Sequence, residues 1–263
     1  MGNGMMYLVA DPNLVALHKA TDDFGLRVAE VLVRENGPGE RYPYAGGAFN
    51  SIAADQLALH RSVISLCSDG WTFATAPLLR TMHDLLISAA IIAEVEPEAE
   101  YRGFKYTHTF LKDNLSNMAF APEQRTRIRE QIEEGLNDLP ASVKDKARAF
   151  MFKERHYGYW HCPEFKRPAD AVDRLFAPAA QVVYRLFSGG THGGYLGLRL
   201  LKADPDNIHP KQRAGAQSQK LALGGATRFT LDTFHVIDRF ITSGRNENEY
   251  NQLLGRLMSL GAA

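Results

Sequence analysis

The sequence predicts an all-α protein folded as a single multi-helix bundle. Apolar residues recur at spacings of three and four through most of the chain, which is the pattern of amphipathic helices. Proline and glycine stand at the boundaries of these segments, whereas few runs alternate in the manner of a strand. We therefore expect about eight helices with short connections in one domain over residues 1–263, without internal repeats.

The first half of the chain predicts three helices that pack together. The first should occupy residues 11–37, because Asp11 can cap a helix that has proline at its first position. The segment GPGERYPYAGG reads as a loop, and a second helix is expected at 50–68. Residues 75–97 are apolar almost all round, which predicts a central buried helix that includes Met82–Ala93.

The second half alternates helices with one irregular, aromatic stretch at residues 153–168. Residues 123–139 are strongly charged, so this helix should lie on the surface. C-terminal helices at 212–260 should pack on a core formed by about residues 55–200. The other helices are expected at residues 98–118, directly after Pro140, and from Ala169 onward.

The composition is that of a soluble globular protein. Thirty basic residues balance thirty acidic ones, so no global field attracts nucleic acid or a membrane. Two cysteines cannot form a disulfide framework, and we find no signal peptide and no apolar run long enough for a membrane span. The expected location is the cytoplasm, and the expected source is bacterial.

Missing motifs exclude several classes of enzyme. The chain has no GxxxxGK[ST], GxGxxG, HExxH or GxSxG, which disfavours nucleotide hydrolysis, dinucleotide redox chemistry and serine hydrolysis. His156, His161 and Cys162 lie close together, but zinc needs three or four ligands and no CxxC pair is present. We expect neither a metal nor a cofactor.

The segment YRLFSGGTHGG, residues 184–194, places several polar groups beside glycines. On a continuous helix Arg185, Ser188 and His192 share one face with Tyr184 nearby. Arginine holds phosphate, and histidine exchanges a proton near neutral pH, so the pair suits phosphate chemistry. The alternative is a helix C-terminus capped by glycine, with His192 at the negative end of the dipole.

Two other groups of polar residues have both a structural and a functional interpretation. Arg80, His83 and Asp84 share one face of the apolar third helix, either as an internal ion pair or as part of a polar pocket. Residues 144–167 carry seven Lys or Arg against three acids, interleaved with aromatic residues that include Trp160. This basic aromatic segment either contacts phosphates and bases or packs its rings on the core.

At YRLFSGGTHGG the chain resembles the HEPN superfamily, which has an arginine and a histidine separated by four to six residues. The wider layout is similar to an uncharacterised bacterial all-helical family, a domain of unknown function, over roughly residues 55–200. The segments that carry this similarity are RTMHD (80–84), YGYWHCP (157–163) and YRLFSGGTH (184–192).

The resemblance implies a helical bundle that dimerises so that two Arg/His motifs face one another. In active members this pair cleaves RNA without metal, in toxin or antiviral defence systems. His192 would then act as general acid or base, Arg185 would stabilise phosphate charge, and Arg80 and Asp84 would support the site. Leu186 after the motif arginine favours the alternative: a non-enzymatic module that binds a nucleotide, a small ligand or a protein through the same polar cluster.

Overall fold

The computed structural model describes residues 11–35, 42–116, 121–152, 160, 165, 168–176 and 216–262. These ranges contain nine α-helices and two short 3-10 segments, and no strand among them, which confirms the all-α class. The α-helices are α1 (Pro12–Glu35), α2 (Pro43–Ser68), α3 (Ala76–Ala93), α4 (Ala99–Ser116), α5 (Pro122–Asn137), α6 (Ala141–Phe152), α7 (Pro168–Leu175), α10 (Ala216–Thr242) and α11 (Glu247–Ser259). The 3-10 segments are η1 (Thr72–Thr75) and η2 (Glu96–Glu98).

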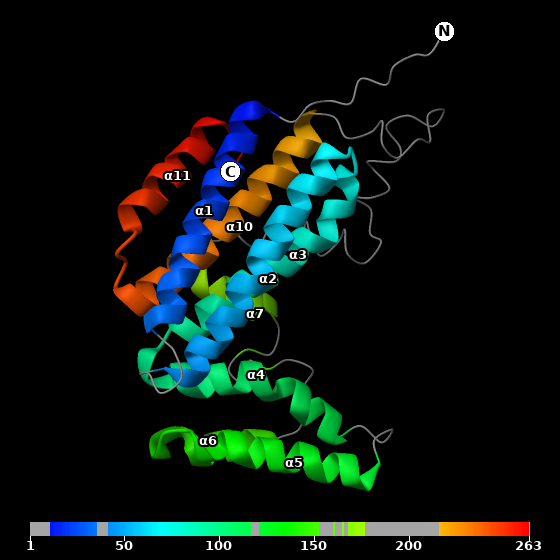
Figure 1. The fold of residues 1–263 in the computed structure, drawn as a ribbon, viewed down its shortest axis with the longest axis vertical. Coiled ribbons are helices and arrows are strands. Elements are labelled where there is room, and N and C mark those ends of the chain that lie inside the picture. Colours follow the sequence, from blue (N-terminus) through cyan, green and yellow to red (C-terminus); the bar gives the residue numbers. More distant parts are fainter. Residues whose placement is uncertain are drawn as a thin grey trace.

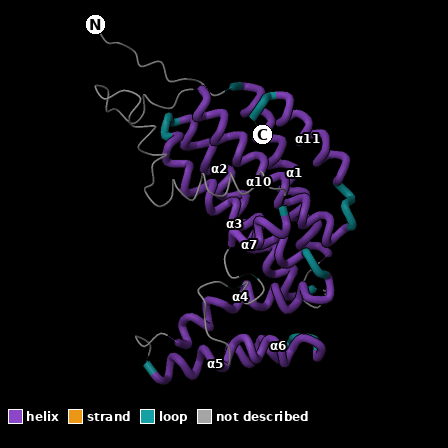
Figure 2. Tube along the Cα trace, turned by 180° about the vertical axis from the view of Figure 1, so that it is seen from behind, coloured by secondary structure: helices purple, strands orange, loops and turns teal. Residues whose placement is uncertain are grey.

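The helices form two packed groups joined by α4. Helix α10 packs against α1, α2 and α3, and α11 packs against α1 and α10 (Figure 1). Helix α4 crosses the lower end of this bundle, and α5 and α6 pack beneath α4 as a pair (Figure 2). The C-terminal helices are thus part of the main bundle.

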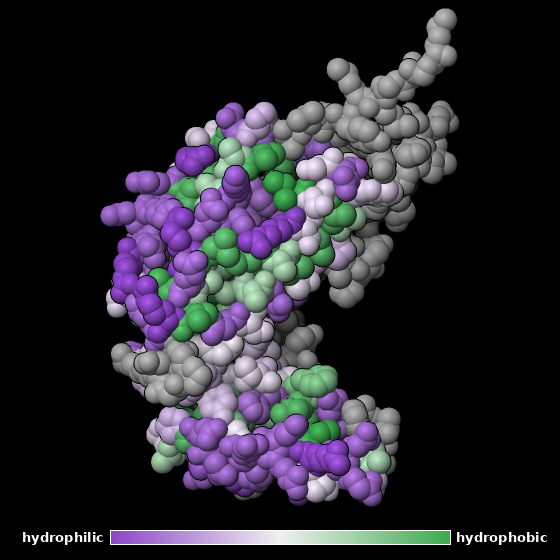
Figure 3. Space-filling model, viewed as in Figure 1, coloured by the Kyte–Doolittle hydropathy of each residue, from purple (hydrophilic) through white to green (hydrophobic). Residues whose placement is uncertain are grey.

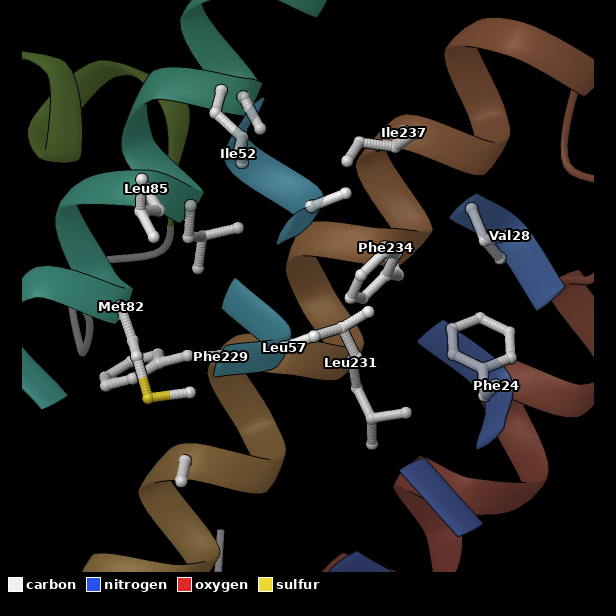
Figure 4. Close-up of a cluster of buried hydrophobic side chains, with 14 of the residues drawn as sticks. Phe24, Val28, Ile52, Leu57, Met82, Leu85, Phe229, Leu231, Phe234 and Ile237 are labelled. Atoms are coloured by element: carbon white, nitrogen blue, oxygen red, sulfur yellow. The ribbon is translucent and has the colours of Figure 1, made fainter. Parts of the chain in front are cut away.

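The main core lies between α1, α2, α3 and α10. Figure 4 shows Phe24 of α1 near Phe234 of α10 on one side of this core, and Met82 of α3 near Phe229 of α10 on the other. Helix α3 buries residues on most of its circumference, as its apolar composition predicts. Among the described helices, α3 alone has the length and hydropathy of a membrane span, and half of that window is buried in the bundle.

A second, smaller core joins α4 to the α5–α6 pair. Its buried residues include Tyr101 and Phe104 of α4, Leu136 of α5 and Phe150 of α6. Helix α5 buries only Ile132, Gly135 and Leu136, so it is the surface helix that its charge predicts. The purple surface over α5 and α6 in Figure 3 shows this hydrophilic character.

The start of α2 corrects the sequence-based boundary. The prediction placed residues through Gly47 in a loop, but the helix begins at Pro43, seven residues before Asn50. Glu100 of α4 explains the difference, because its carboxylate accepts the N–H groups of Tyr44 at 3.2 Å and Ala45 at 2.9 Å. This carboxylate satisfies two donors that the first turn of a helix otherwise leaves free.

Gly103 allows this close contact between α2 and α4. A Cβ atom on Gly103 would lie 2.5 Å from the backbone nitrogen of Ala45. Only glycine lets the first turn of α2 approach α4 this closely. The first helix, in contrast, starts as predicted, with the Asp11 carboxylate accepting the Asn13 N–H at 2.9 Å.

Candidate functional site

The predicted site residues divide into two groups. Arg80, His83 and Asp84 lie on α3 and Trp160 lies beside the bundle, all within the described residues. The predicted catalytic residues Arg185, Ser188 and His192, together with Tyr184, lie outside the described residues. The structure therefore describes the part of the candidate site that lies on and beside α3.

Arg80 and Asp84 form the ion pair that their spacing predicts. Arg80 Nη2 lies 3.0 Å from Asp84 Oδ1, one helical turn away. The Arg80 side chain is 14% exposed and that of Asp84 is 44% exposed, so the pair lies at the edge of the bundle. Burial raises the pKa of Asp84, while the Arg80 charge opposes this shift. The carboxylate fixes the direction of a mostly buried guanidinium.

His83 lies on the inner side of the same face. Its ring is buried and stacks on Phe229 of α10, with a centroid distance of 4.8 Å and an interplanar angle of 13°. Phe176 approaches from the α7 side at 6.5 Å. Burial, with a smaller contribution from the Arg80 charge, lowers the pKa of His83 to about 4. His83 is therefore a neutral ring within the packing, at the base of the Arg80–Asp84 pair.

Trp160 packs on the core. Its ring meets Tyr106 of α4 edge-on at 5.3 Å. It also packs against the apolar cluster that joins Ile87 and Ile91 of α3 to α7. Ile87 is three residues beyond Asp84, so Trp160 covers the next turn of the same face of α3.

The described part of the basic aromatic segment is paired within the chain. Arg148 donates to both carboxylate oxygens of Glu133, at 2.7 and 2.5 Å. Lys146 donates to Glu98, and Lys144 donates to the Asn137 carbonyl at 3.3 Å. These three cations stabilise the packing of α6, and the remaining basic residues of the segment lie outside the described residues.

A buried polar cluster between α1, α2 and α10 was missed from the sequence. The rings of His18 and His60 stack, and His18 Nε2 lies 2.9 Å from the His60 carbonyl. Asp22 lies beside His60 and accepts hydrogen bonds from Arg61 at 2.9 to 3.1 Å. Forty-two residues separate the histidines, and no local pattern connects them. The cluster links the protein surface at Arg61 to the core.

Metal ligation receives no support from the described geometry. No group of three or more His, Cys, Asp or Glu side chains in those ranges is arranged to hold a metal ion. The described groups of the site instead offer a guanidinium that a carboxylate holds in position, which suits anion binding.

Comparison with known proteins gives one match. A family of unknown function, DUF5677, matches residues 48–208, which is more than half of the chain. Neither the curated proteins nor the solved structures gave a match. The matched segment begins in α2, contains Arg80, Asp84 and Trp160, and continues through residues 184–192. The chain therefore belongs to DUF5677, a family of unknown function.

Proposed function

We propose that the protein is a HEPN-like, metal-independent endoribonuclease of a toxin or defence type, acting as a homodimer in the cytoplasm. The observation that carries this proposal is the Arg80–Asp84 ion pair at the edge of the central helix. A guanidinium held in place by a carboxylate is prepared to contact phosphate without first losing side-chain freedom. The family match contains this pair and the segment 184–192 in one unit, which supports their joint use.

The reaction assigned to this site needs one proton acceptor and charge stabilisation. His192 removes the proton from a ribose 2′-hydroxyl, whose oxygen attacks the adjacent phosphorus. The bond from phosphorus to the 5′-oxygen breaks, and that oxygen takes up a proton from water as it leaves. Arg185 and Arg80 stabilise the charge on the phosphate, and Ser188 donates a hydrogen bond to it. The products are a 2′,3′-cyclic phosphate and a 5′-hydroxyl.

His83 has a different role in this scheme. Because it is buried against Phe229, we assign it no proton transfer. It supports the turn of α3 that carries Arg80 and Asp84. Trp160 likewise supports the next turn through its contacts with α3 and α4.

Incubation with mixed RNA tests the proposal. Wild type should cleave RNA equally with and without EDTA, and the new ends should carry cyclic phosphate. His192→Ala and Arg185→Ala should each lower the rate by about 100-fold or more, because general acid–base and electrostatic terms have that size. Arg256→Ala is the matched control, since Arg256 is exposed on α11, outside the proposed site.

Two outcomes would contradict the ribonuclease. Cleavage that survives His192→Ala, or that stops only with EDTA, rejects the metal-free mechanism. Folded wild type that leaves RNA intact favours the non-enzymatic binding module. One observation favours the binding module: Lys146 and Arg148 form ion pairs with acids of the same chain, which offset positive charge that would attract RNA. Light scattering of the same preparation measures the molar mass in solution, which should be that of a homodimer.

A further inference from the structure

A cleft lies at the end of the bundle where α3 and α10 finish and α2 begins. Its volume is about 670 Å³, within the range of small-molecule sites. The described lining comes from α1, α3, η2, α7 and α10, from the residue before α2, and from the residues directly after α3 and α10. Its members include Glu35, Tyr42, Ala93, Glu94, Glu96, Leu175, Arg239 and Phe240. The lining residues Ala90 and Ala93 of α3 are about 9 and 14 Å beyond Asp84 along the helix axis, so neither member of the Arg80–Asp84 pair lines this cleft.

Part of the cleft is apolar and held in place by ring packing. Phe240 packs against Tyr42 with centroids 4.9 Å apart, and against the buried Phe49 at 5.2 Å. Ala93 of α3 and Leu175 of α7 supply further apolar surface. These groups can cover the hydrocarbon body of a bound molecule.

Two of the three lining carboxylates form ion pairs with arginines around the cleft. Glu94 accepts Arg102 at 3.0 Å on one oxygen and Arg174 at 2.5 Å on the other. Glu35 pairs with Arg245 at 3.1 Å and lies 3.6 Å from Arg34. These arginines offset the charges of Glu94 and Glu35 in the cleft.

Glu96, the third lining carboxylate, accepts the hydroxyl of Tyr42. Tyr42 is the residue whose ring packs on Phe240, so this hydrogen bond also holds the aromatic part of the cleft. All three carboxylates thus serve the architecture of the cleft.

Arg239 differs from the other arginines. It is exposed in the cleft, and within the described residues no carboxylate lies within ion-pair distance of it. The Glu247 carboxylate lies near its aliphatic stem, across Gly244, without forming an ion pair. Arg239 is therefore the arginine of the described lining that is left to meet a bound anion.

The turn beside Arg239 is rigidly built. The Asp238 carboxylate accepts the Thr242 hydroxyl at 2.8 Å and the Asn246 backbone N–H at 2.9 Å. Ser243, in the lining, has a positive φ of 59°, which these hydrogen bonds maintain. The cleft is therefore largely formed before a ligand arrives, which reduces the entropy lost on binding.

We propose that this cleft binds a small organic anion. Its carboxylate or phosphate pairs with Arg239, and its apolar body, about the size of one aromatic ring, packs on Phe240, Ala93 and Leu175. Both parts are needed, because an exposed ion pair contributes little by itself and the apolar surface adds the rest. This site stands independently of the proposed ribonuclease.

Calorimetric titration of the full chain tests the site with four probes. Phenyl phosphate and benzoate carry both the ring and an anionic group, and their comparison decides between phosphate and carboxylate. Inorganic phosphate lacks the ring, and benzylamine replaces the anion with a cation. We expect at least one aromatic anion to bind in the micromolar to millimolar range, and both control probes to bind at least about tenfold more weakly.

Two variants and one control locate the binding. Arg239→Gln should weaken the aromatic anion by about tenfold or more, as expected for the loss of a charge-assisted hydrogen bond. Arg256→Gln removes an exposed arginine of α11 outside the cleft and should leave affinity unchanged. Ala93→Phe should block the apolar part and abolish binding, and a thermal melt checks that this variant is folded.

Each remaining outcome overturns the proposal. The first is that wild type binds neither aromatic anion at millimolar concentration. The second is that Arg239→Gln binds the aromatic anion as tightly as wild type does. The third is that benzylamine binds wild type as tightly as benzoate does. If Ala93→Phe does not fold, the exposed Arg239→Gln variant alone decides.

Discussion

The imidazole rings of His18 and His60 stack face to face, with centroids 3.4 Å apart and planes within 13° of each other. Both side chains are buried, one on α1 and the other on α2. Burial, with a smaller contribution from the neighbouring His60, lowers the pKa of His18 to about 3. Burial also lowers the pKa of His60, although Asp22 opposes that shift. The pair is therefore neutral at pH 7.

This pair predicts acid destabilisation that begins well above the carboxylate range. Below pH 6.5 the histidines of the unfolded chain take up protons that those of the folded chain do not. The free energy of unfolding therefore decreases as the pH is lowered. Each histidine contributes a slope of up to about 1.4 kcal/mol per pH unit until its folded pKa is reached. His60→Phe keeps an aromatic ring at this position but removes one titrating group. Between pH 6.5 and 5, the free energy of unfolding of this variant should therefore change less steeply with pH than that of wild type, by up to about 1.4 kcal/mol per pH unit. Urea unfolding at several pH values measures both slopes, and equal slopes would contradict the prediction.

The contact between Gly103 and the start of α2 predicts opposite effects for two glycine-to-alanine changes. Gly103→Ala places a Cβ 2.5 to 2.6 Å from the backbone of Tyr44 and Ala45 and should cost about 2 kcal/mol or more. Gly47→Ala, in the exposed face of α2 with nothing within 4 Å, should stabilise by about 0.5–1 kcal/mol. Chemical denaturation compares them. A neutral Gly103→Ala would mean that α2 does not approach α4 in this way.

The capping carboxylate predicts a second effect on the same junction. Glu100→Ala removes the acceptor of the Tyr44 and Ala45 N–H groups, so the free energy of unfolding should fall by about 1–3 kcal/mol. Glu130→Ala is the control, because Glu130 is exposed on α5 and should change stability by less than about 0.5 kcal/mol. If both variants unfold at the same urea concentration as wild type, the cap does not hold α2.

The Arg80–Asp84 pair predicts a modest stability effect. A fully buried pair would lose about 3–5 kcal/mol on Arg80→Ala, but Asp84 is 44% exposed. We therefore expect a coupling energy of about 0.2–1 kcal/mol between Arg80→Ala and Asp84→Asn in a double-mutant cycle. The cycle is measured by urea unfolding. A coupling above about 2 kcal/mol would show that the pair behaves as a buried one.

Local pattern alone predicted most helices and the interior position of α3. The spacing of apolar residues records which side of a helix is buried, and the Asp11–Pro12 start depends on a hydrogen bond within two residues. The Arg80–Asp84 pair was equally predictable, because i and i+4 are neighbours on any helix.

The early start of α2, the His18–His60 stack and the cleft around Arg239 were decided by the tertiary structure. Glu100 is fifty-five residues from the N–H group of Ala45 that it accepts. The arginines that neutralise Glu35 and Glu94 likewise come from other helices or from a distant turn. Such contacts depend on which helices pack together and on how far each is shifted along its axis relative to its neighbour. Periodicity specifies the buried face of each helix, but the pairing of distant side chains is set only when those faces meet.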